Sequence, residues 1–180
     1  MIKKIFAVAL LCAAMMISGC SDSAQVESTT NTAQASPVAK SVPAFTAKTI
    51  TGETVTNEIF TAKKITVVNI WGTFCPPCIG EMPELGEMAR NMPADAQLIG
   101  LICDASDGSQ QIQKAIAITQ EAGADFVNIV PDESLNGFMA NVEAVPTTIF
   151  VNSKGEVVGK AIIGADVDGY KNELQRLLAQ

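Results

Sequence analysis

The feature that most constrains this chain is an apolar run that stops just before a pair of cysteines. Residues 65–71 read Ile-Thr-Val-Val-Asn-Ile-Trp, and such a β-branched run is typical of a strand buried on both faces of a sheet. The cysteines follow at Cys75 and Cys78, and the chain beyond them has apolar residues at helical spacing, namely Leu85, Met88, Ala89 and Met92. A buried strand that leads directly into an amphipathic helix is the repeating unit of a layered α/β fold.

The alternation of strand and helix patterns continues to the end of the chain. Two short segments, 45–50 and 53–56, predict a β-hairpin, and further strands are expected at 97–103, 126–130, 147–152 and 157–163. Helices are expected around 112–119, over 132–142 and around 170–178. The sequence has no internal repeat, so we predict one α/β domain over residues 42–180, with a central mixed β-sheet flanked by helices.

The N-terminal residues carry a separate pattern. Two lysines precede an uncharged apolar run over residues 5–17, which matches a secretory signal and is too short for a membrane-spanning helix. The run ends in Ile-Ser-Gly-Cys at 17–20, which resembles the bacterial lipobox, where the cysteine is lipidated and the chain is cleaved before it. We therefore predict a lipoprotein signal peptide at 1–19, a lipidated Cys20, and a flexible tether over 20–41 that is rich in small and polar residues.

Charge and composition exclude several classes of function. The chain has 19 acidic and 12 basic residues, and cleavage before Cys20 removes two of the lysines, so the formal net charge changes from −7 to −9. An acidic protein is not expected to bind nucleic acid or anionic lipid headgroups, so membrane attachment would depend on the acyl chains. The chain has no histidine, which excludes serine–histidine triads, histidine-activated cysteines and histidine metal sites.

The position of the cysteine pair at the start of a helix suits thiol–disulfide exchange. Two cysteines three residues apart on a first helical turn can form a disulfide, and the free N–H groups and positive dipole of a helix N-terminus favour a thiolate. We predict that Cys75, at the cap position with an exposed sulfur, is the nucleophile. Cys78, one turn inside the helix and more buried, is expected to resolve the mixed disulfide.

The segment from Trp71 to Cys78 resembles the active-site stretch of the thioredoxin superfamily, in particular that of the ResA/TlpA-like lipid-anchored thiol-disulfide oxidoreductases. The resemblance covers roughly residues 42–180, and it implies a thioredoxin fold with an N-terminal β-hairpin and a central insertion. Pro83 resembles the proline inside the active-site helix of thioredoxin, where its role is structural. Phe74 departs from the pattern, since the branch usually has tryptophan directly before the first cysteine.

The resemblance also implies site residues. Val145-Pro146 resembles the cis-proline segment that faces the disulfide and pairs with the backbone of an incoming substrate. Glu81 matches a glutamate that can accept the proton of the resolving thiol, although the alternative is a solvated helix residue. The predicted catalytic residues are Cys75, Cys78 and Glu81, and the predicted substrate-binding residues are Trp71, Phe74, Pro76, Pro77, Val145 and Pro146.

Other thiol chemistries fit the sequence less well. Zinc takes four ligands, whereas the globular domain has only Cys75, Cys78 and Cys103, and c-type haem attachment needs a histidine where Ile79 stands. A peroxiredoxin-like peroxidase would have proline-threonine-cysteine at its nucleophile, which is absent, so peroxide is not the expected substrate. We expect no metal site and no cofactor. Cys103 is interpreted as a small buried hydrophobic residue, with a regulatory or mixed-disulfide role as the alternative.

The predicted function is that of an extracytoplasmic thiol-disulfide oxidoreductase that reduces the disulfides of client proteins, anchored to a bacterial membrane by Cys20 in a periplasm or on an outer surface. The expected partners are the clients, which by resemblance include apocytochrome c during cytochrome c maturation, and an upstream electron donor.

Two alternatives to this function remain. The same cysteine pair can run in the opposite direction as a disulfide oxidase or isomerase, although Pro76-Pro77 removes two N–H donors near Cys75, which favours a reductant. The chain can instead be a non-enzymatic lipoprotein that binds a partner or Cu(I) through its thiols.

Overall fold

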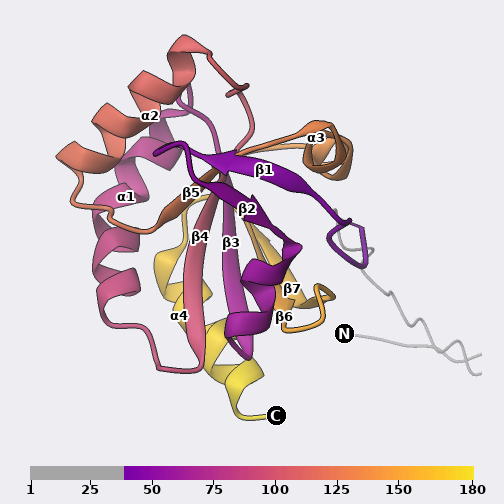
Figure 1. Ribbon diagram of the computed structural model, residues 1–180. Helices are drawn as coiled ribbons and strands as arrows, with labels where there is room; N and C mark the ends of the chain where they lie inside the picture. Colours follow the sequence, from indigo (N-terminus) through magenta and orange to yellow (C-terminus); the bar gives the residue numbers. More distant parts are fainter. Residues whose placement is uncertain (1–38) are drawn as a thin grey trace, which may run out of the picture. The chain divides into compact units, whose positions relative to one another are not determined.

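Strands and helices alternate along the computed structural model, which describes residues 39–180 (Figure 1). The strands of this part of the chain are β1 (Thr46–Thr49), β2 (Thr54–Thr56), β3 (Ile65–Trp71), β4 (Ala96–Ile102), β5 (Val127–Val130), β6 (Thr147–Asn152) and β7 (Val157–Ile163). The helices are the 3₁₀ helix η1 (Asn57–Ala62) and the α-helices α1 (Pro76–Arg90), α2 (Gln110–Glu121), α3 (Glu133–Met139) and α4 (Val167–Leu178).

One mixed sheet joins the strands in the order β2-β1-β5-β4-β3-β6-β7. Strands β3, β4 and β5 are parallel, whereas β6 and β7 extend one side of the sheet as antiparallel strands and β1 and β2 extend the other. The β1–β2 pair is the predicted N-terminal hairpin. Between β4 and α3, α2 and β5 form the central insertion, and β5 lies between β1 and β4. The predicted α/β fold class is therefore confirmed.

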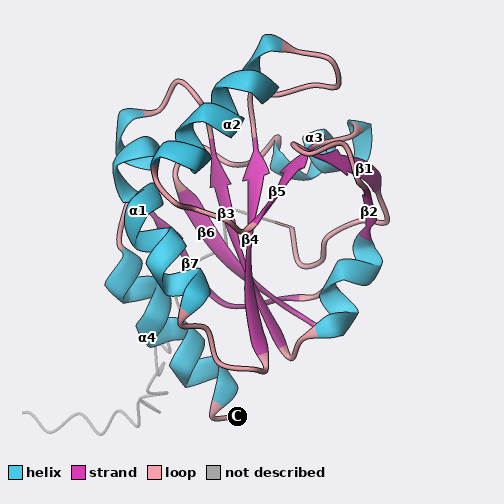
Figure 2. Ribbon diagram, turned by 60° about the vertical axis from the view of Figure 1, so that its left-hand side comes forward, coloured by secondary structure: helices cyan, strands magenta, loops and turns pink. Residues whose placement is uncertain are grey.

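Strand β3 is buried along its whole length because helices cover both faces of the sheet. Val67 and Trp71 belong to a hydrophobic cluster to which α1, α2 and α4 contribute, while Val68 and Ile70 belong to a second cluster to which α3 and η1 contribute. Figure 2 shows α1 and α4 on one side of the sheet and α3 on the other. Thr66 and Asn69 are the buried polar residues of this strand, and Asn69 Nδ2 donates to Glu81 on α1 and to Thr148 on β6.

Helix α1 begins directly at the cysteine pair. Cys75 is its N-cap residue, and Pro76 and Pro77 occupy the first two helical positions, where a missing N–H costs no intrahelical bond. The helix continues across Pro83. Of the predicted apolar stripe, Leu85 and Met88 are buried in the core and Ala89 packs against it, while Met92 packs against the same cluster from just beyond the end of the helix.

The sequence patterns missed η1 and placed one boundary too far along the chain. Residues 57–62 mix polar and apolar side chains without a clear period, and the turn is stabilised locally by the Thr56 hydroxyl, which accepts from the Glu58 N–H.

The ordered domain includes Lys40, which was predicted to be part of the tether. The Val157 N–H donates to the Lys40 carbonyl over 2.9 Å, so Lys40 is attached to the domain.

The predicted signal peptide at 1–19, the lipidated Cys20 and the tether up to residue 38 lie outside the described residues. Within residues 39–180, no helix is both long enough and apolar enough to cross a membrane.

Gly86 allows α1 to approach the turn that follows α2. A Cβ atom at this position would lie 2.6 Å from the carbonyl oxygen of Gly123 and 3.0 Å from the Cα of Ala124. Both neighbours are backbone atoms in a packed interior, so they cannot move aside as a flexible side chain would.

We predict that Gly86→Ala lowers the free energy of unfolding by about 1–3 kcal/mol, because the added methyl overpacks this contact. Gly80 on the same helix is the matched control, since its Cβ would meet no atom within 4 Å. Gly80→Ala should be neutral or stabilising by up to about 1 kcal/mol, because alanine is the better helix former. Urea unfolding measures both changes, and equal stabilities for the two variants would contradict the close contact at Gly86.

Candidate active site

Cys75 and Cys78 form a disulfide at the N-terminus of α1, with their Cα atoms 5.3 Å apart. The Cys78 N–H is directed at Cys75 Sγ over 3.3 Å. Because Pro76 and Pro77 have no N–H, Cys78 supplies the backbone donor within the motif. In the dithiol form, this N–H and the helix dipole would stabilise a thiolate on Cys75.

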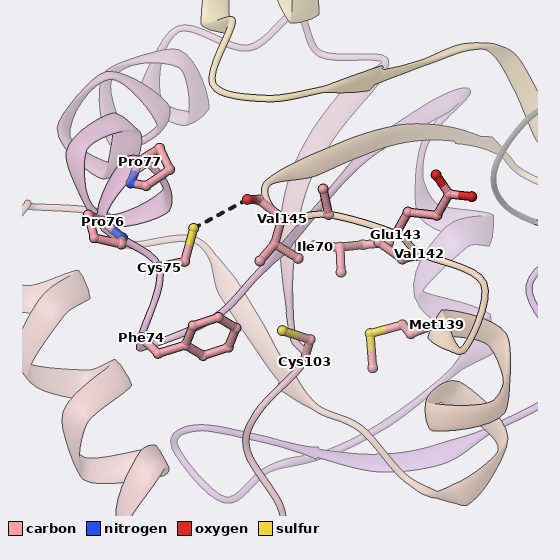
Figure 3. Close-up of a pocket in the computed structure, with 11 residues that line it drawn as sticks. Ile70, Phe74, Cys75, Pro76, Pro77, Cys103, Met139, Val142, Glu143 and Val145 are labelled. Atoms are coloured by element: carbon pink, nitrogen blue, oxygen red, sulfur yellow. Dashed lines mark hydrogen bonds between the residues drawn. The ribbon is translucent and has the colours of Figure 1, made fainter.

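The sulfur of Cys75 is buried in the structure, whereas the sequence predicted that it would be exposed. In the disulfide form Cys75 is only 4% exposed and Cys78 is fully buried, so Cys75 is the outer cysteine by a small margin. The reason is the neighbouring loop, because Cys75 Sγ faces the Val145 carbonyl oxygen at 3.4 Å (Figure 3). A disulfide sulfur has no proton to donate, so this contact can become a hydrogen bond only in the dithiol form.

The Val145–Pro146 peptide bond is cis, and Pro146 is buried directly before β6. The Thr147 hydroxyl donates to the Ala144 carbonyl over 2.7 Å, and the Gly164 N–H donates to the Pro146 carbonyl over 2.8 Å. These bonds fix the loop whose Val145 carbonyl faces the disulfide. The structure thus brings Cys75, Cys78, Val145 and Pro146 together from segments far apart in the sequence.

The loop between β3 and α1 is held by a side chain that the sequence analysis did not identify. Asp104, just after β4, accepts hydrogen bonds from the Thr73 N–H at 3.0 Å and from the Thr73 hydroxyl at 2.6 Å. A Cβ atom at Gly72 would lie 2.6 Å from the Phe74 ring. Glycine at position 72 thus leaves room for the Phe74 ring, whose side chain is 62% exposed.

A groove of about 480 Å³ runs beside Cys75 (Figure 3). Most of the side chains along it are apolar, and Glu143 is the one charged residue among them. Its lining comes from β3, the start of α1, the end of β4 and the α3–β6 loop, and it consists of Ile70, Phe74, Cys75, Pro76, Pro77, Cys103, Met139, Val142, Glu143, Ala144 and Val145.

Trp71 is a core residue, and the prediction that it binds substrate is wrong. Its side chain is 0% exposed, and its Nε1–H donates to Asn128 Oδ1 over 2.9 Å. Trp71 is the last residue of β3 and faces the cluster under α1, so no client can contact it. Of the predicted substrate-binding residues, Phe74, Pro76, Pro77 and Val145 line the groove, and Pro146 is adjacent to it.

Glu81 is buried, so the alternative of a solvated helix residue is wrong. It is 4% exposed and lies three residues after Cys78 on the buried side of α1. Asn69 Nδ2 donates to its Oε1 over 2.9 Å, and its Oε2 is 3.0 Å from the Tyr170 hydroxyl. Burial raises the pKa of Glu81 above 4.5, while the hydrogen bonds from Asn69 and Tyr170 lower it and nearby Glu84 raises it.

Cys103 lies in the groove rather than in the closed core. Its side chain is half-buried, and its sulfur lies between Phe74 and Met139 in Figure 3. Burial, together with the adjacent Asp104 carboxylate, raises the pKa of the Cys103 thiol to about 11. A thiol in this state is a poor nucleophile at neutral pH, which favours a packing role.

These features define a thioredoxin-fold protein with a redox-active cysteine pair at the start of its first long helix. The model of the AhpC/TSA family matches residues 38–160, and the chain belongs to this family.

The chain is similar in sequence to thiol-disulfide oxidoreductases of bacteria. The thiol-disulfide oxidoreductase ResA of Halalkalibacterium halodurans is 33% identical over 92 residues, which are 51% of this chain and 49% of ResA. The thiol:disulfide interchange protein DsbE of Haemophilus influenzae is 30% identical over 125 residues, 67% of this chain and 63% of DsbE. The matches thus span about half to two thirds of these curated relatives, and they confirm the resemblance to the ResA-like branch.

A solved structure shows the same fold. The thiol:disulfide interchange protein of the thioredoxin family from Chlorobium tepidum superimposes with a TM-score of 0.60 at 19% identity, covering 78% of this chain and 94% of that one.

We predict that Glu81→Gln stabilises the protein at neutral pH. The folded state keeps a proton on Glu81 that the unfolded chain loses above pH 4.5, so wild-type stability falls as pH rises from that value towards the raised pKa. Glutamine cannot ionise, and the variant avoids this loss, which amounts to at most about 1.4 kcal/mol per pH unit. Urea unfolding at pH 4 and pH 7 measures it, with exposed Glu87→Gln on the same helix as the control. A stability difference that does not grow with pH would contradict the burial argument.

We predict that Cys103 is alkylated slowly in the native protein. With a pKa of about 11, only about one thiol in a thousand is ionised at pH 8. Iodoacetamide labelling, read at the Cys103 peptide by mass spectrometry, should accelerate with pH up to about 11 and should be fast at pH 8 in urea. Equal labelling rates in the native and unfolded protein at pH 8 would contradict the raised pKa.

Proposed function

We propose that this protein is a thiol-disulfide oxidoreductase that reduces the disulfides of client proteins. The observation that carries the proposal is the position of the Cys75–Cys78 disulfide, which lies at a helix N-terminus, against the Val145 carbonyl and beside an apolar groove. The names of the ResA and DsbE relatives support the same chemistry.

The reaction begins from the dithiol form. The Cys75 thiolate attacks one sulfur of the client disulfide, the client S–S bond breaks, and the departing client thiolate takes up a proton. Cys78 then loses its proton and attacks Cys75 Sγ, which breaks the mixed disulfide and releases the second client sulfur as a thiolate that takes up a proton. Two electrons pass from the cysteine pair to the client, so an upstream dithiol donor must reduce the Cys75–Cys78 disulfide again.

Glu81 is the proposed acceptor of the Cys78 proton. The two residues are three apart in α1, so they lie on the same side of the helix, and both are buried. The chain has no histidine that could take this proton instead. The raised pKa of Glu81 brings its proton affinity closer to that of a thiol, which suits proton transfer between them.

The client would bind along the groove. An extended client segment can pair with the backbone at Val145, while exposed Phe74 and the Pro76-Pro77 rings contact the residues around its cysteine. The apolar lining, which includes Met139 and Val142, favours an apolar client side chain next to the cysteine. Apocytochrome c is the client class that the family resemblance implies.

The number of N–H donors near Cys75 supports the proposed direction of electron flow, from the cysteine pair to the client. With two prolines inside the motif, few N–H groups stabilise the thiolate, and a less stabilised thiolate makes a stronger reductant. The midpoint potential against glutathione tests this point, and a potential well above that of glutathione would instead favour the oxidase or isomerase.

Catalytic turnover separates the enzyme from a thiol-based binding protein. The purified protein should reduce insulin disulfides over many cycles with dithiothreitol as the electron source, and metal-free preparations should work equally well. Stoichiometric reaction without turnover, or a requirement for copper, would favour the non-enzymatic alternative.

We predict that Cys78→Ala traps clients as mixed disulfides whereas Cys75→Ala traps none, because the first thiol attacks and the second releases. Non-reducing electrophoresis followed by mass spectrometry detects the trapped species. Trapping by the Cys75→Ala protein would reverse the two roles.

The pattern of residues 1–20 bears on where the protein acts in the cell. We propose that the protein acts outside the cytoplasm, held on a bacterial membrane by acyl chains on Cys20. Cys20→Ala should then give a folded, redox-active domain that no longer sediments with membranes, because the fold does not depend on the acyl chains. Unchanged membrane retention of the variant would contradict the lipid anchor.

A further inference from the structure

The hydroxyl of Tyr170 has more hydrogen-bond partners than its single proton can serve. It lies 2.7 Å from the Gly164 carbonyl oxygen and 3.0 Å from Glu81 Oε2, and it accepts from the Asp166 N–H at 3.2 Å. A carbonyl oxygen can only accept a hydrogen bond. When the Tyr170 proton points to Gly164, the contact with Glu81 is a hydrogen bond only if the carboxyl group donates.

The hydrogen bond between Asn69 and Glu81 indicates which carboxyl oxygen of Glu81 would carry that proton. Asn69 Nδ2 donates to Oε1, so Oε1 is an acceptor, and the proton of a neutral Glu81 belongs on Oε2, facing Tyr170. In this state Glu81 donates to Tyr170 and Tyr170 donates to Gly164. When Glu81 loses its proton, the Tyr170 O–H can rotate away from Gly164 and donate to Oε2 instead.

We propose that Tyr170 is a positioning residue for Glu81, whose hydroxyl turns between the Gly164 carbonyl and the carboxyl group and so supplies a hydrogen-bond partner in both protonation states. The proposal rests on the proposed function of Glu81 as proton acceptor and adds the group that lets a buried carboxyl gain and lose a proton without rearrangement. Tyr170 is fully buried, so water does not take over this task.

Few other charges face this carboxyl group. On α1, Glu84 is exposed and the sulfurs of Cys75 and Cys78 lie one to two turns away, while on α4 exposed Asp166 caps the helix. The strands β3 and β6 contribute the uncharged side chains of Asn69 and Thr148, and the one charged residue of β7, Lys160, is exposed. Tyr170 remains neutral throughout, because burial raises its pKa to about 12.

The sign of the effect follows from the strengths of the two hydrogen bonds. When Glu81 ionises, Tyr170 gives up its bond to Gly164 and donates instead to a carboxylate, and such a bond is about twice as strong as a neutral one. The hydrogen bond from Tyr170 lowers the pKa of Glu81, so the hydroxyl favours ionised Glu81 on balance. Tyr170→Phe should therefore move the acid limb of the pH–rate profile for mixed-disulfide resolution to higher pH, by about one unit.

A second variant strengthens the Tyr170 hydroxyl as a hydrogen-bond donor, whereas Tyr170→Phe removes it. Tyr170 is the only tyrosine of the chain, so biosynthetic incorporation of 3-fluorotyrosine modifies this residue alone. The fluorinated phenol is a stronger donor and a weaker acceptor, so the acid limb should move to lower pH. A residue that only fills space would not shift the profile in opposite directions in the two proteins.

The experiment measures single-turnover oxidation of the dithiol by a small disulfide across pH, in wild type and both variants, each with and without Glu81→Gln. The expected result is opposite shifts that both disappear in the Glu81→Gln background. Shifts of the same sign, or shifts that persist with Glu81→Gln, overturn the proposal. Thr119→Val is the control, since it removes a buried hydroxyl whose bonds stay within α2, and it should leave the profile unchanged. A shift of the same size in this control also overturns the proposal.

A direct titration keeps the test independent of activity. ¹³C NMR of the Glu81 carboxyl carbon in the oxidised protein should give a higher pKa in Tyr170→Phe and a lower one with 3-fluorotyrosine, and identical titrations overturn the proposal. The fluorinated protein keeps the hydroxyl and serves even when Tyr170→Phe does not fold. A wild-type protein that shows these NMR shifts and yet reduces no insulin would contradict the proposed function alone.

Discussion

The antiparallel pairing of β3 with β6 is the constraint on which the site depends. Its register places Ile70 opposite Thr147 and Asn69 opposite Thr148. The chain leaving β3 towards Cys75 therefore passes the Val145–Pro146 bond that enters β6, and the two halves of the site meet at one end of the sheet. Because side chains alternate between the faces of a strand, a slip of one residue would turn Thr148 away from Asn69 and separate the buried polar groups.

The same register explains how the core tolerates an acidic side chain. Asn69, Glu81, Thr148 and Tyr170 come from β3, α1, β6 and α4, and each has a hydrogen-bond partner among the others or in the backbone. An apolar group at any of these positions would pack with less cost than a buried polar group. Burial raises the pKa of Glu81, while its hydrogen bonds with Asn69 and Tyr170 lower it and so offset part of that cost.

The sequence predicted those parts of the structure that depend on local pattern. Strand β3 was predicted at its observed bounds, because a run of mostly β-branched residues from Ile65 to Trp71 is typical of a strand buried on both faces. The cysteine motif located the start of α1. Residue roles that depend on tertiary packing were less accessible. Trp71 was predicted to bind substrate because it stands in the same segment as the cysteine motif, yet its ring lies in the core.

Other site residues gave only a weak signal in the sequence. Tyr170 begins the last predicted helix, around 170–178, and its ring does pack in the core, but nothing in the sequence revealed what its hydroxyl contacts. Asp104 and Met139 come together with the cysteines only through the sheet order. The one available signal was Asn69, because an amide within a fully buried strand requires a polar partner.

Lys40 and Val42 are hydrogen-bonded to the chain around the β6–β7 turn, at the end of the domain remote from the disulfide. These residues bind the backbone at Val157 and Gly155, beyond the end of β6 that is opposite to Pro146. Strand β6 has six residues, so its two ends are about 20 Å apart. Whatever precedes residue 39 thus joins the domain at the pole remote from the disulfide. A partner that reaches the disulfide therefore does not need to contact the part of the domain where residue 39 enters it.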